Sequence, residues 1–255
     1  MLVKSIVLKW LMKMNKQIEG IIIREKDYSD TSKIIDVFTK DYGIIGVIAK
    51  GSKSMKSKLR SVTNKFTYGI FNLYYQENKL STLREVDIID NLSKIKTDIT
   101  RIAYSTFLVD LAEQVYKQKE DSDIYNLLIS SLIKINNGFD TLAITNIVEL
   151  KYLKYLGVMP SLNGCCVCGC KDVVTLSSDR GGYICESCRR GEPLINEKTL
   201  KLIRMFYYVD IPKIENINIS DGIKQEINGF LDLYYEKYTG LYLKSKKFLD
   251  NLKLI

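Results

Sequence analysis

The sequence predicts an α+β multidomain protein in which an N-terminal β-barrel precedes an α-helical domain that carries a four-cysteine insert. Three observations favour this fold class. Residues 15–90 contain short runs of β-branched and aromatic residues, and the rest of the chain places apolar residues at helical spacing. All six cysteines lie between Cys165 and Cys188. At 255 residues, 46% of them hydrophobic, the chain is long enough to form two small domains.

Five short strands are predicted between Ile18 and Asp90, with turn residues between them. They cover Glu19–Arg24, Lys33–Thr39, Ile44–Ala49, Phe66–Tyr75 and Leu80–Ile89. Five strands in so short a segment favour a small closed barrel, and the five-stranded OB-fold is one such barrel. A split sandwich has the same local pattern, so it stays an alternative.

Helical spacing of apolar residues begins after Asn91. It predicts helices over Asp98–Lys117, Asp123–Ile135, Thr141–Leu156, Asn196–Tyr208 and Ile223–Leu254. We therefore divide the chain into an N-terminal extension (1–14), an OB-fold domain (15–90), a first helical part (91–160), a cysteine element (161–192) and a second helical part (193–255). Met14 offers an alternative start, because the recognisable pattern begins right after it.

Lysine and arginine outnumber aspartate and glutamate by 38 to 30, which gives a formal net charge of +8. This excess favours polyanionic partners. The chain has no histidine, which excludes Ser-His-Asp, Cys-His and histidine–metal sites. Gly51–Ser57 lacks the second glycine of a phosphate-binding P-loop, so no nucleotide site is expected. We expect a protein that is not an enzyme.

The N-terminal segment is the only part of the given sequence that resembles a targeting signal. Lys4, Lys9 and Lys13 interrupt its apolar runs, and no small-residue cleavage site follows. No later stretch approaches the roughly 18 uninterrupted apolar residues of a membrane span. We therefore expect a soluble, cytoplasmic protein with no membrane partner.

Four cysteines form two C-x2-C pairs, Cys165/Cys168 and Cys185/Cys188, with sixteen residues between the pairs. This spacing is typical of a four-cysteine zinc site, because two thiolates on one tight turn can share a tetrahedral ion. Asp179–Gly182 indicates a short hairpin that carries the second pair. Four thiolate ligands leave no position open for water, so we expect one structural Zn²⁺ ion.

Two further cysteines leave the choice of ligands open. Cys166 or Cys170 could replace a ligand of the first pair, since their spacing is also permitted for zinc. We favour Cys165 with Cys168 because this spacing equals that of the second pair. An iron–sulfur cluster is another possible interpretation. A redox C-x-x-C pair is a further alternative, but under it the presence of two motifs at the spacing of zinc ligands would be a coincidence.

A basic segment without acidic residues, from Lys50 to Lys65, lies between the third and fourth predicted strands. Gly51 and four serines make it flexible enough to follow a phosphate backbone, and loops of OB-like barrels carry their binding surface. We therefore predict phosphate contacts through Lys50, Lys53, Lys56, Lys58 and Arg60. For a lysine run alone, a solvated loop is the simpler interpretation.

Aromatic residues follow this loop along the fourth predicted strand. Alternation sends Phe66, Tyr68 and Tyr74 to one face and Phe71 and Tyr75 to the other. One face must be core, so at most one set can stack on bases, and the pattern does not decide which. Two smaller basic sets could extend a nucleic-acid path or form solvated faces: Arg180, Arg189 and Arg190, and Lys244, Lys246 and Lys247.

Four segments follow one another along the chain: EGIIIREKDYSDTSKIIDVFTKDYGIIGVIAKGSKS, LREVDIID, KYLKYLGVMPSLNGCCVCG and GGYICESCRR. In this order they resemble the RecO family of bacterial recombination mediators. The resemblance runs from about Asn15 to the C-terminus and weakens after Glu192. It implies an N-terminal OB-fold and a helical domain with a zinc element set within it. The first segment and the stretch leading into the cysteines are its specific parts.

This resemblance implies activity without catalysis. Members bind single- and double-stranded DNA, anneal complementary strands and help RecA replace single-strand binding protein on gapped DNA. The implied partners are RecR, often RecF as well, and the C-terminal tail of single-strand binding protein, at the nucleoid in the cytoplasm. The family's zinc ligands fall on Cys165, Cys168, Cys185 and Cys188, and its basic stretch falls on Lys50 through Arg60.

The chain departs from the family pattern in two respects. Lysines stand at most positions of the basic stretch where relatives often have arginine, so bidentate phosphate contacts would be fewer. Cys166 and Cys170 are additional to the usual four and leave the ligand choice slightly open.

Two other functions fit parts of the sequence. A zinc-ribbon protein that binds RNA or the transcription machinery would use the cysteine region with Arg180, Arg189 and Arg190. A metal-dependent nuclease would need clustered carboxylates for Mg²⁺. The nearest groupings lie among turn signals without a recognisable motif: Asp27/Asp30, Asp87/Asp90 and Asp121/Asp123.

Overall fold

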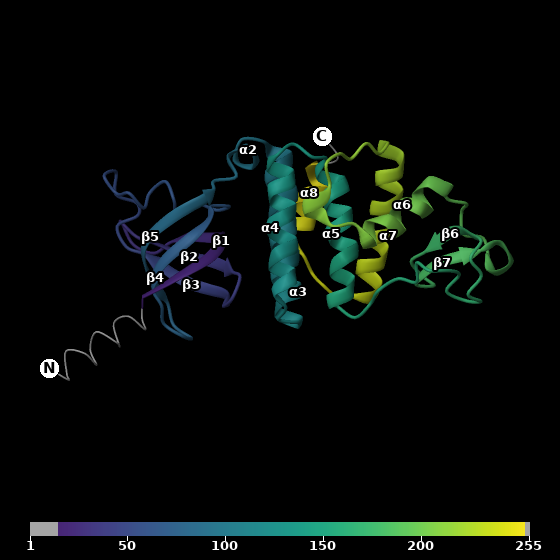
Figure 1. Ribbon diagram of the computed structural model, residues 1–255, viewed down its shortest axis with the longest axis horizontal. Coiled ribbons are helices and arrows are strands. Elements are labelled where there is room, and N and C mark those ends of the chain that lie inside the picture. The colour runs from purple at the N-terminus through teal and green to yellow at the C-terminus, as the bar shows by residue number, and fades with distance from the viewer. Residues whose placement is uncertain (1–14, 253–255) are drawn as a thin grey trace. The chain divides into compact units, whose positions relative to one another are not determined.

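The computed structural model describes residues 15–252 and contains a five-stranded barrel, a set of helices and a two-stranded hairpin (Figure 1). These residues divide into two compact units. The barrel unit comprises the described residues up to Lys96 together with Glu120–Ile129, and the helical unit comprises the others. The predicted extension and the alternative start at Met14 lie outside the described residues.

The barrel consists of β1 (Asn15–Asp27), β2 (Lys33–Thr39), β3 (Gly43–Ala49), β4 (Tyr68–Tyr74) and β5 (Ser81–Asp90). The strand order is β1-β2-β3-β5-β4, and β1 pairs with β4 to close the barrel. Only the pairing of β3 with β5 is parallel, with Val47 opposite Ser81. The predicted barrel is confirmed, and its closure excludes the split sandwich.

Alternating side chains from all five strands fill the barrel, as the two-residue period of a strand predicts. Ile22, Ile35, Val47, Phe71 and Leu83 are buried in this core. Strand β4 begins at Tyr68 and not at the predicted Phe66, because the backbone of Phe66 has a φ of 67° and cannot continue a strand.

A second apolar layer lies outside the barrel. Phe38 alternates with the core residue Val37 and therefore points away from the barrel interior, yet its side chain is buried. Helix α4 (Ser122–Asn136) covers it, since the ring of Tyr125 meets the ring of Phe38 edge-on at a centroid distance of 5.5 Å. Residues 120–129 thus complete the barrel unit.

The helical unit is built around α5 (Thr141–Tyr155), whose side chains are mostly buried. Helix α5 packs against α3 (Ile99–Gln118), α6 (Glu197–Tyr208) and α7 (Asp221–Tyr238), and α3 also packs against α8 (Lys244–Leu252). The short helix α2 (Ser93–Lys96) belongs to the barrel unit. None of the described helices is long and apolar enough to cross a membrane.

A partly buried polar cluster fixes the start of α5. The Asp140 carboxylate accepts a hydrogen bond of 2.8 Å from the N–H of Ala143, which is the contact of a helix N-cap. The ammonium group of Lys224, on α7, lies 2.5 Å from the other Asp140 oxygen. The Asn146 side chain donates to the Lys224 backbone oxygen at 2.9 Å, so α5 and α7 are joined by polar contacts as well as by packing.

The predicted helix Ile223–Leu254 is wrong in one respect. The structure contains two helices there, and α7 ends at Tyr238 while α8 begins at Lys244. Gly240, between them, has a φ of 62°, a left-handed conformation that ends a helix. Apolar spacing runs through the break because each helix buries a face of its own. Residues 253 and 254 lie outside the described part of the chain.

The cysteine element lies between α5 and α6. Strands β6 (Val173–Ser177) and β7 (Gly182–Cys185) form the predicted hairpin, and the 3₁₀ turn η1 (Glu186–Cys188) follows directly. A second 3₁₀ turn, η2 (Ile211–Lys213), comes after α6.

Candidate functional site

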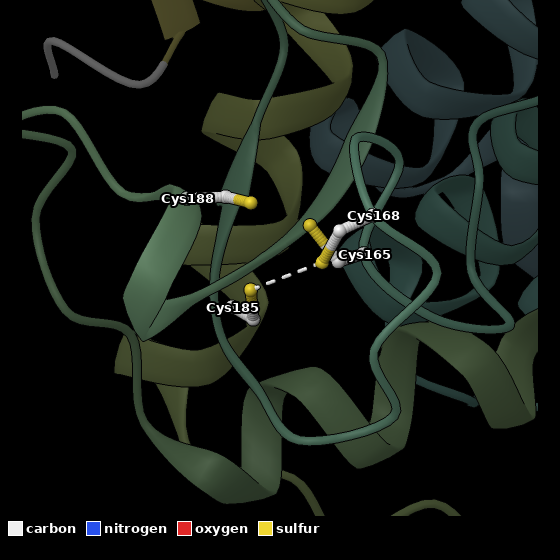
Figure 2. A group of neighbouring side chains, drawn as sticks. All are labelled: Cys165, Cys168, Cys185 and Cys188. Atoms are coloured by element: carbon white, nitrogen blue, oxygen red, sulfur yellow. Dashed lines mark hydrogen bonds between the residues drawn. The ribbon is translucent and has the colours of Figure 1, made fainter.

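The four cysteines of the two C-x2-C pairs converge on one point. The sulfur atoms of Cys165, Cys168, Cys185 and Cys188 all lie within 4.8 Å of one another (Figure 2). A tetrahedral ion with zinc–sulfur bonds of about 2.3 Å would hold such sulfurs about 3.8 Å apart. Small movements would therefore close the group around an ion, and these four residues could hold a metal. The group does not include Cys166 or Cys170.

Backbone hydrogen bonds form the turns that carry the sulfurs. In the first pair, the N–H of Gly169 donates to the Cys165 oxygen at 2.9 Å, and the N–H of Cys165 donates to the Cys170 oxygen at 2.8 Å. The second pair lies at the end of β7 and in η1. The N–H of Cys166 donates to the Tyr183 oxygen at 2.8 Å, which ties the first turn to β7.

The environment of the cysteines favours a thiolate at one position even without a metal. Burial opposes ionisation of the Cys165 thiol, but backbone N–H groups of Cys168, Cys185 and Val167 outweigh it and lower the pKa of Cys165 to about 6. Hydrogen bonds within the cluster, first of all with Cys168, raise the pKa of Cys188 to about 12. A divalent cation would draw the remaining protons from the cluster, because metal ligation requires thiolates.

Two of the three arginines beside the cysteines are engaged in the element itself. Arg180 donates to the Cys188 backbone oxygen at 2.5 Å and pairs with Glu192 at 3.4 Å. Arg189 pairs with Glu186 at 2.7 Å. These contacts hold the second turn in place, and they leave less of this basic set available for nucleic acid than the zinc-ribbon interpretation requires.

The basic loop connects β3 to β4 as a series of turns and not as a flexible tether. The N–H of Ser57 donates to the Ser54 oxygen at 3.1 Å, and that of Arg60 donates to the Ser57 oxygen at 3.2 Å. Leu59 and Val62 pack against the barrel core. The loop is anchored because these two apolar side chains contact the core of the barrel.

The anchored loop exposes most of its charges. Lys50, Lys56, Lys58 and Arg60 are exposed, and Lys53 is half-buried. The ammonium group of Lys53 lies 2.7 Å from the Asp27 carboxylate, and this hydrogen bond holds the pKa of Asp27 below its usual range. The loop N–H of Lys53 also donates to the Thr31 oxygen at 2.9 Å, so the loop is tied to the β1–β2 turn.

The aromatic residues of β4 do not form one exposed stacking face. Phe66 and Phe71 are buried, although alternation assigned them to opposite faces. Tyr68 donates to Glu19 at 2.8 Å, and the Arg84 guanidinium lies 5.0 Å from the Tyr74 ring centre.

Three residues near the barrel surface were missed by the sequence analysis. Tyr42, in the β2–β3 turn, is 41% exposed and contacts Tyr75 at a centroid distance of 5.1 Å. The ammonium group of Lys16 lies 4.3 Å from the Tyr42 ring centre. Lys33 begins β2 and lies opposite Ala49, next to the basic loop. The register of β2 with β3 places Lys33 there, and turn signals alone do not fix that register.

The carboxylates required by a nuclease do not gather. Asp27 is paired with Lys53, and Asp87 accepts a hydrogen bond of 2.9 Å from Asn72. Within residues 15–252, the cysteine group is the only set of three or more cysteine, aspartate or glutamate residues whose ligand atoms lie close enough together to hold a metal ion.

Comparisons with known proteins cover almost the whole chain. The family described as recombination protein O N terminal matches residues 12–92, and recombination protein O C terminal matches residues 96–247. The DNA repair protein RecO of Bacillus subtilis (strain 168) is 36% identical over 240 residues, which is 92% of this chain and 94% of that protein. The DNA repair protein RecO of Listeria monocytogenes serotype 4b (strain CLIP80459) is 35% identical over 239 residues, which is 92% of this chain and 93% of that protein.

Proposed function

This chain belongs to the RecO family of DNA repair proteins, and we propose that it is a non-catalytic recombination mediator. The barrel unit binds single- and double-stranded DNA, and the bound protein anneals complementary strands. Together with RecR, and with RecF where it takes part, it helps load RecA onto DNA covered by single-strand binding protein. It acts in the cytoplasm at the nucleoid.

The observation that carries this proposal is the anchored basic loop on an OB-like barrel. Its five cations are Lys50, Lys53, Lys56, Lys58 and Arg60, and four of them are exposed. Contacts of this kind are to phosphate and carry no sequence information, as annealing of arbitrary sequences requires. Neutralising two strands lowers their mutual repulsion, so annealing is accelerated without a covalent step.

The cysteine group would hold one structural Zn²⁺ ion through Cys165, Cys168, Cys185 and Cys188. The ion would supply only cross-linking of the two turns, because four thiolates complete a tetrahedral coordination shell. The helical unit would provide contacts for protein partners, including the acidic tail of single-strand binding protein.

The test is annealing of two complementary oligonucleotides coated with the cognate single-strand binding protein. The wild-type protein should accelerate annealing, and a variant with the five loop cations changed to alanine should not. A matched control removes five exposed lysines outside the loop: Lys79, Lys119, Lys198, Lys201 and Lys213. The control should retain most of the activity, because both variants lose the same net charge.

Two results would contradict the proposal. One is equal annealing by the loop variant and the wild-type protein. The other is an absence of acceleration by wild-type protein that is folded and loaded with metal, and this result would favour the zinc-ribbon alternative.

A further inference from the structure

The β1–β2 turn presents an aromatic side chain, that of Tyr28, which has no partner. The residue is 60% exposed, and within residues 15–252 its ring forms no aromatic or cation–π contact and its hydroxyl forms no hydrogen bond. The other tyrosines of the barrel unit each contact a neighbouring ring, cation or carboxylate: Tyr42, Tyr68, Tyr74, Tyr75 and Tyr125. Single exposed aromatic residues are common on protein surfaces, so the significance of Tyr28 depends on what lies beside it.

Hydrogen bonds fix this turn and join it to the basic loop. The N–H of Tyr28 donates to the Ser32 oxygen at 3.1 Å, which closes the turn. From the loop, the N–H of Lys53 donates to the Thr31 oxygen at 2.9 Å. The N–H of Gly51 donates to the Ser32 hydroxyl oxygen at 3.3 Å. The backbone of Tyr28 is therefore held beside the loop that supplies the cations.

The turn and the loop carry opposite charges, and this difference orients a bound strand. Asp27 ends β1 and Asp30 lies in the turn, and both are exposed, whereas the loop from Lys50 to Lys65 has no acidic residue. The Lys53 ammonium group lies 2.7 Å from the Asp27 carboxylate, so the two charges meet directly beside Tyr28. Phosphates are attracted to the loop and repelled by Asp30, so a strand held at the loop can place its bases over the turn but not its phosphates.

We propose that the Tyr28 ring stacks on an unpaired base of a DNA strand whose phosphates contact the basic loop. Every base has a π-face, so this contact adds affinity without reading sequence. Bases in a duplex are already stacked on one another, so Tyr28 favours single-stranded over double-stranded DNA. The loop cations cannot set this preference, because both forms of DNA present phosphates. The inference deepens the proposed function and rests on its assignment of the loop as the phosphate contact.

The test uses the full chain with Tyr28→Ala, Tyr28→Phe and, as a control, Tyr208→Ala. Tyr208 is 62% exposed but lies on α6 in the helical unit. Binding is measured to a single strand, to the duplex of the same sequence, and to a strand of the same length whose nucleotides lack bases. Tyr28→Ala should weaken binding of the normal single strand about 5- to 100-fold, the effect of one lost base–aromatic stack. Tyr28→Phe should keep most of the affinity, and Tyr208→Ala should bind as the wild-type protein does.

The duplex, the abasic strand and the salt dependence distinguish stacking from a disturbed loop. Tyr28→Ala should bind the duplex and the abasic strand as tightly as the wild-type protein does, because neither offers an unpaired base. Its slope of log affinity against log salt should stay the same, since no phosphate contact is lost. Equal binding of the normal single strand by Tyr28→Ala and the wild-type protein overturns the inference. Equal weakening of all three nucleic acids also overturns it, because the substitution would then have acted through the loop.

The variant with the five loop cations changed to alanine separates this inference from the proposed function. It should lose binding of all three nucleic acids, the abasic strand included, because it removes the phosphate contacts. If it binds them as the wild-type protein does, the proposed function fails, and a loss by Tyr28→Ala confined to the normal single strand would still support stacking at the turn. If the loop variant loses binding and Tyr28→Ala does not, the proposed function stands and the stacking contact is overturned.

Discussion

Two lysines of the same loop have different surroundings and should contribute differently to DNA binding. Lys53 is half-buried, and its ammonium group is paired with Asp27 at 2.7 Å. Lys56 is exposed and forms no ion pair within the described residues. A phosphate that contacts Lys53 must compete with a carboxylate already in place, whereas Lys56 offers its whole charge.

We predict that Lys56→Ala lowers the salt dependence of single-strand binding more than Lys53→Ala does. The wild-type protein should show a slope of log affinity against log salt near −4, and each full phosphate contact contributes about −0.7. Lys56→Ala should therefore reduce the slope by about 0.7, and Lys53→Ala by less. Affinity measured over a series of salt concentrations tests this, and equal changes for the two variants would contradict it.

Tyr68 shows how a single partly buried side chain makes stability depend on pH. Burial, followed by its hydrogen bond to Glu19, raises the pKa of Tyr68 from 10.0 to about 12. The protonated phenol is thus favoured in the folded state. Its stabilising effect is fully present below pH 10, where the unfolded chain keeps its phenol protonated, and is lost as the pH rises to 12.

We predict that Tyr68→Phe removes this part of the alkaline sensitivity. The melting temperature of the wild-type protein should fall more steeply between pH 10 and 12 than that of Tyr68→Phe, because phenylalanine cannot ionise. Melting curves at a series of pH values give the comparison. Other tyrosines are common to both proteins, so parallel curves would show that Tyr68 does not contribute.

At the scale of elements, the cysteine hairpin depends on one close backbone approach. Ser161 pairs with the hairpin through hydrogen bonds of 2.9 Å, as donor to Gly181 and acceptor from Tyr183. A β-carbon on Gly182 would lie 2.4 Å from the Ser161 oxygen and 2.7 Å from its nitrogen. Backbone atoms cannot move aside as the end of a side chain can, so glycine is required there.

We predict that Gly182→Ala lowers stability by about 1–3 kcal/mol and accelerates loss of the bound metal. Gly229→Ala is the control, because its β-carbon would meet nothing within 4 Å and its backbone is not left-handed. Thermal melting and competition with a chelator measure the two effects. Removal of the metal should lower the melting temperature of the wild-type protein as well, and an unchanged melting temperature would contradict a structural ion.

At the scale of the whole molecule, the two units alternate along the chain. The barrel unit takes residues 120–129 from a segment that follows α3, and α3 itself belongs to the helical unit. Tyr125 from that segment covers Phe38 and accounts for the burial of an outward-facing side chain. The barrel unit is therefore not a contiguous piece of sequence, although residues 15–90 contain all its strands.

We predict that a fragment ending at Lys96 is less stable than the same fragment joined by a linker to residues 120–129. Without that segment, the Phe38 ring would be exposed to water, and burial of an aromatic side chain contributes about 1.5–3 kcal/mol. Melting temperature and binding of a hydrophobic dye distinguish the fragments. Identical behaviour of the two would show that the segment does not complete the unit.

Local patterns in the sequence determined much of the fold. The two-residue alternation of β2 and β3 predicted strands at nearly the observed bounds, because one face of each fills the barrel. The spacing of Cys165/Cys168 and Cys185/Cys188 predicted which sulfurs meet, since each pair lies on one tight turn. The order of the four quoted segments and their motifs also indicated membership of the RecO family. The spacing of apolar residues did not reveal the break at Gly240, because two successive helices that each bury one face give a continuous helical pattern.

Only the tertiary structure decided which groups share a site. Strand register brings Lys33 beside the loop, and packing of Leu59 and Val62 against the barrel core holds that loop in place. Ion pairs with Glu25 and Asp27 then set how much charge Lys33 and Lys53 offer. The physical reason is the distance along the chain between the residues in contact. Periodicity reflects only which face of one element is buried, whereas these contacts join residues that meet only when the barrel closes.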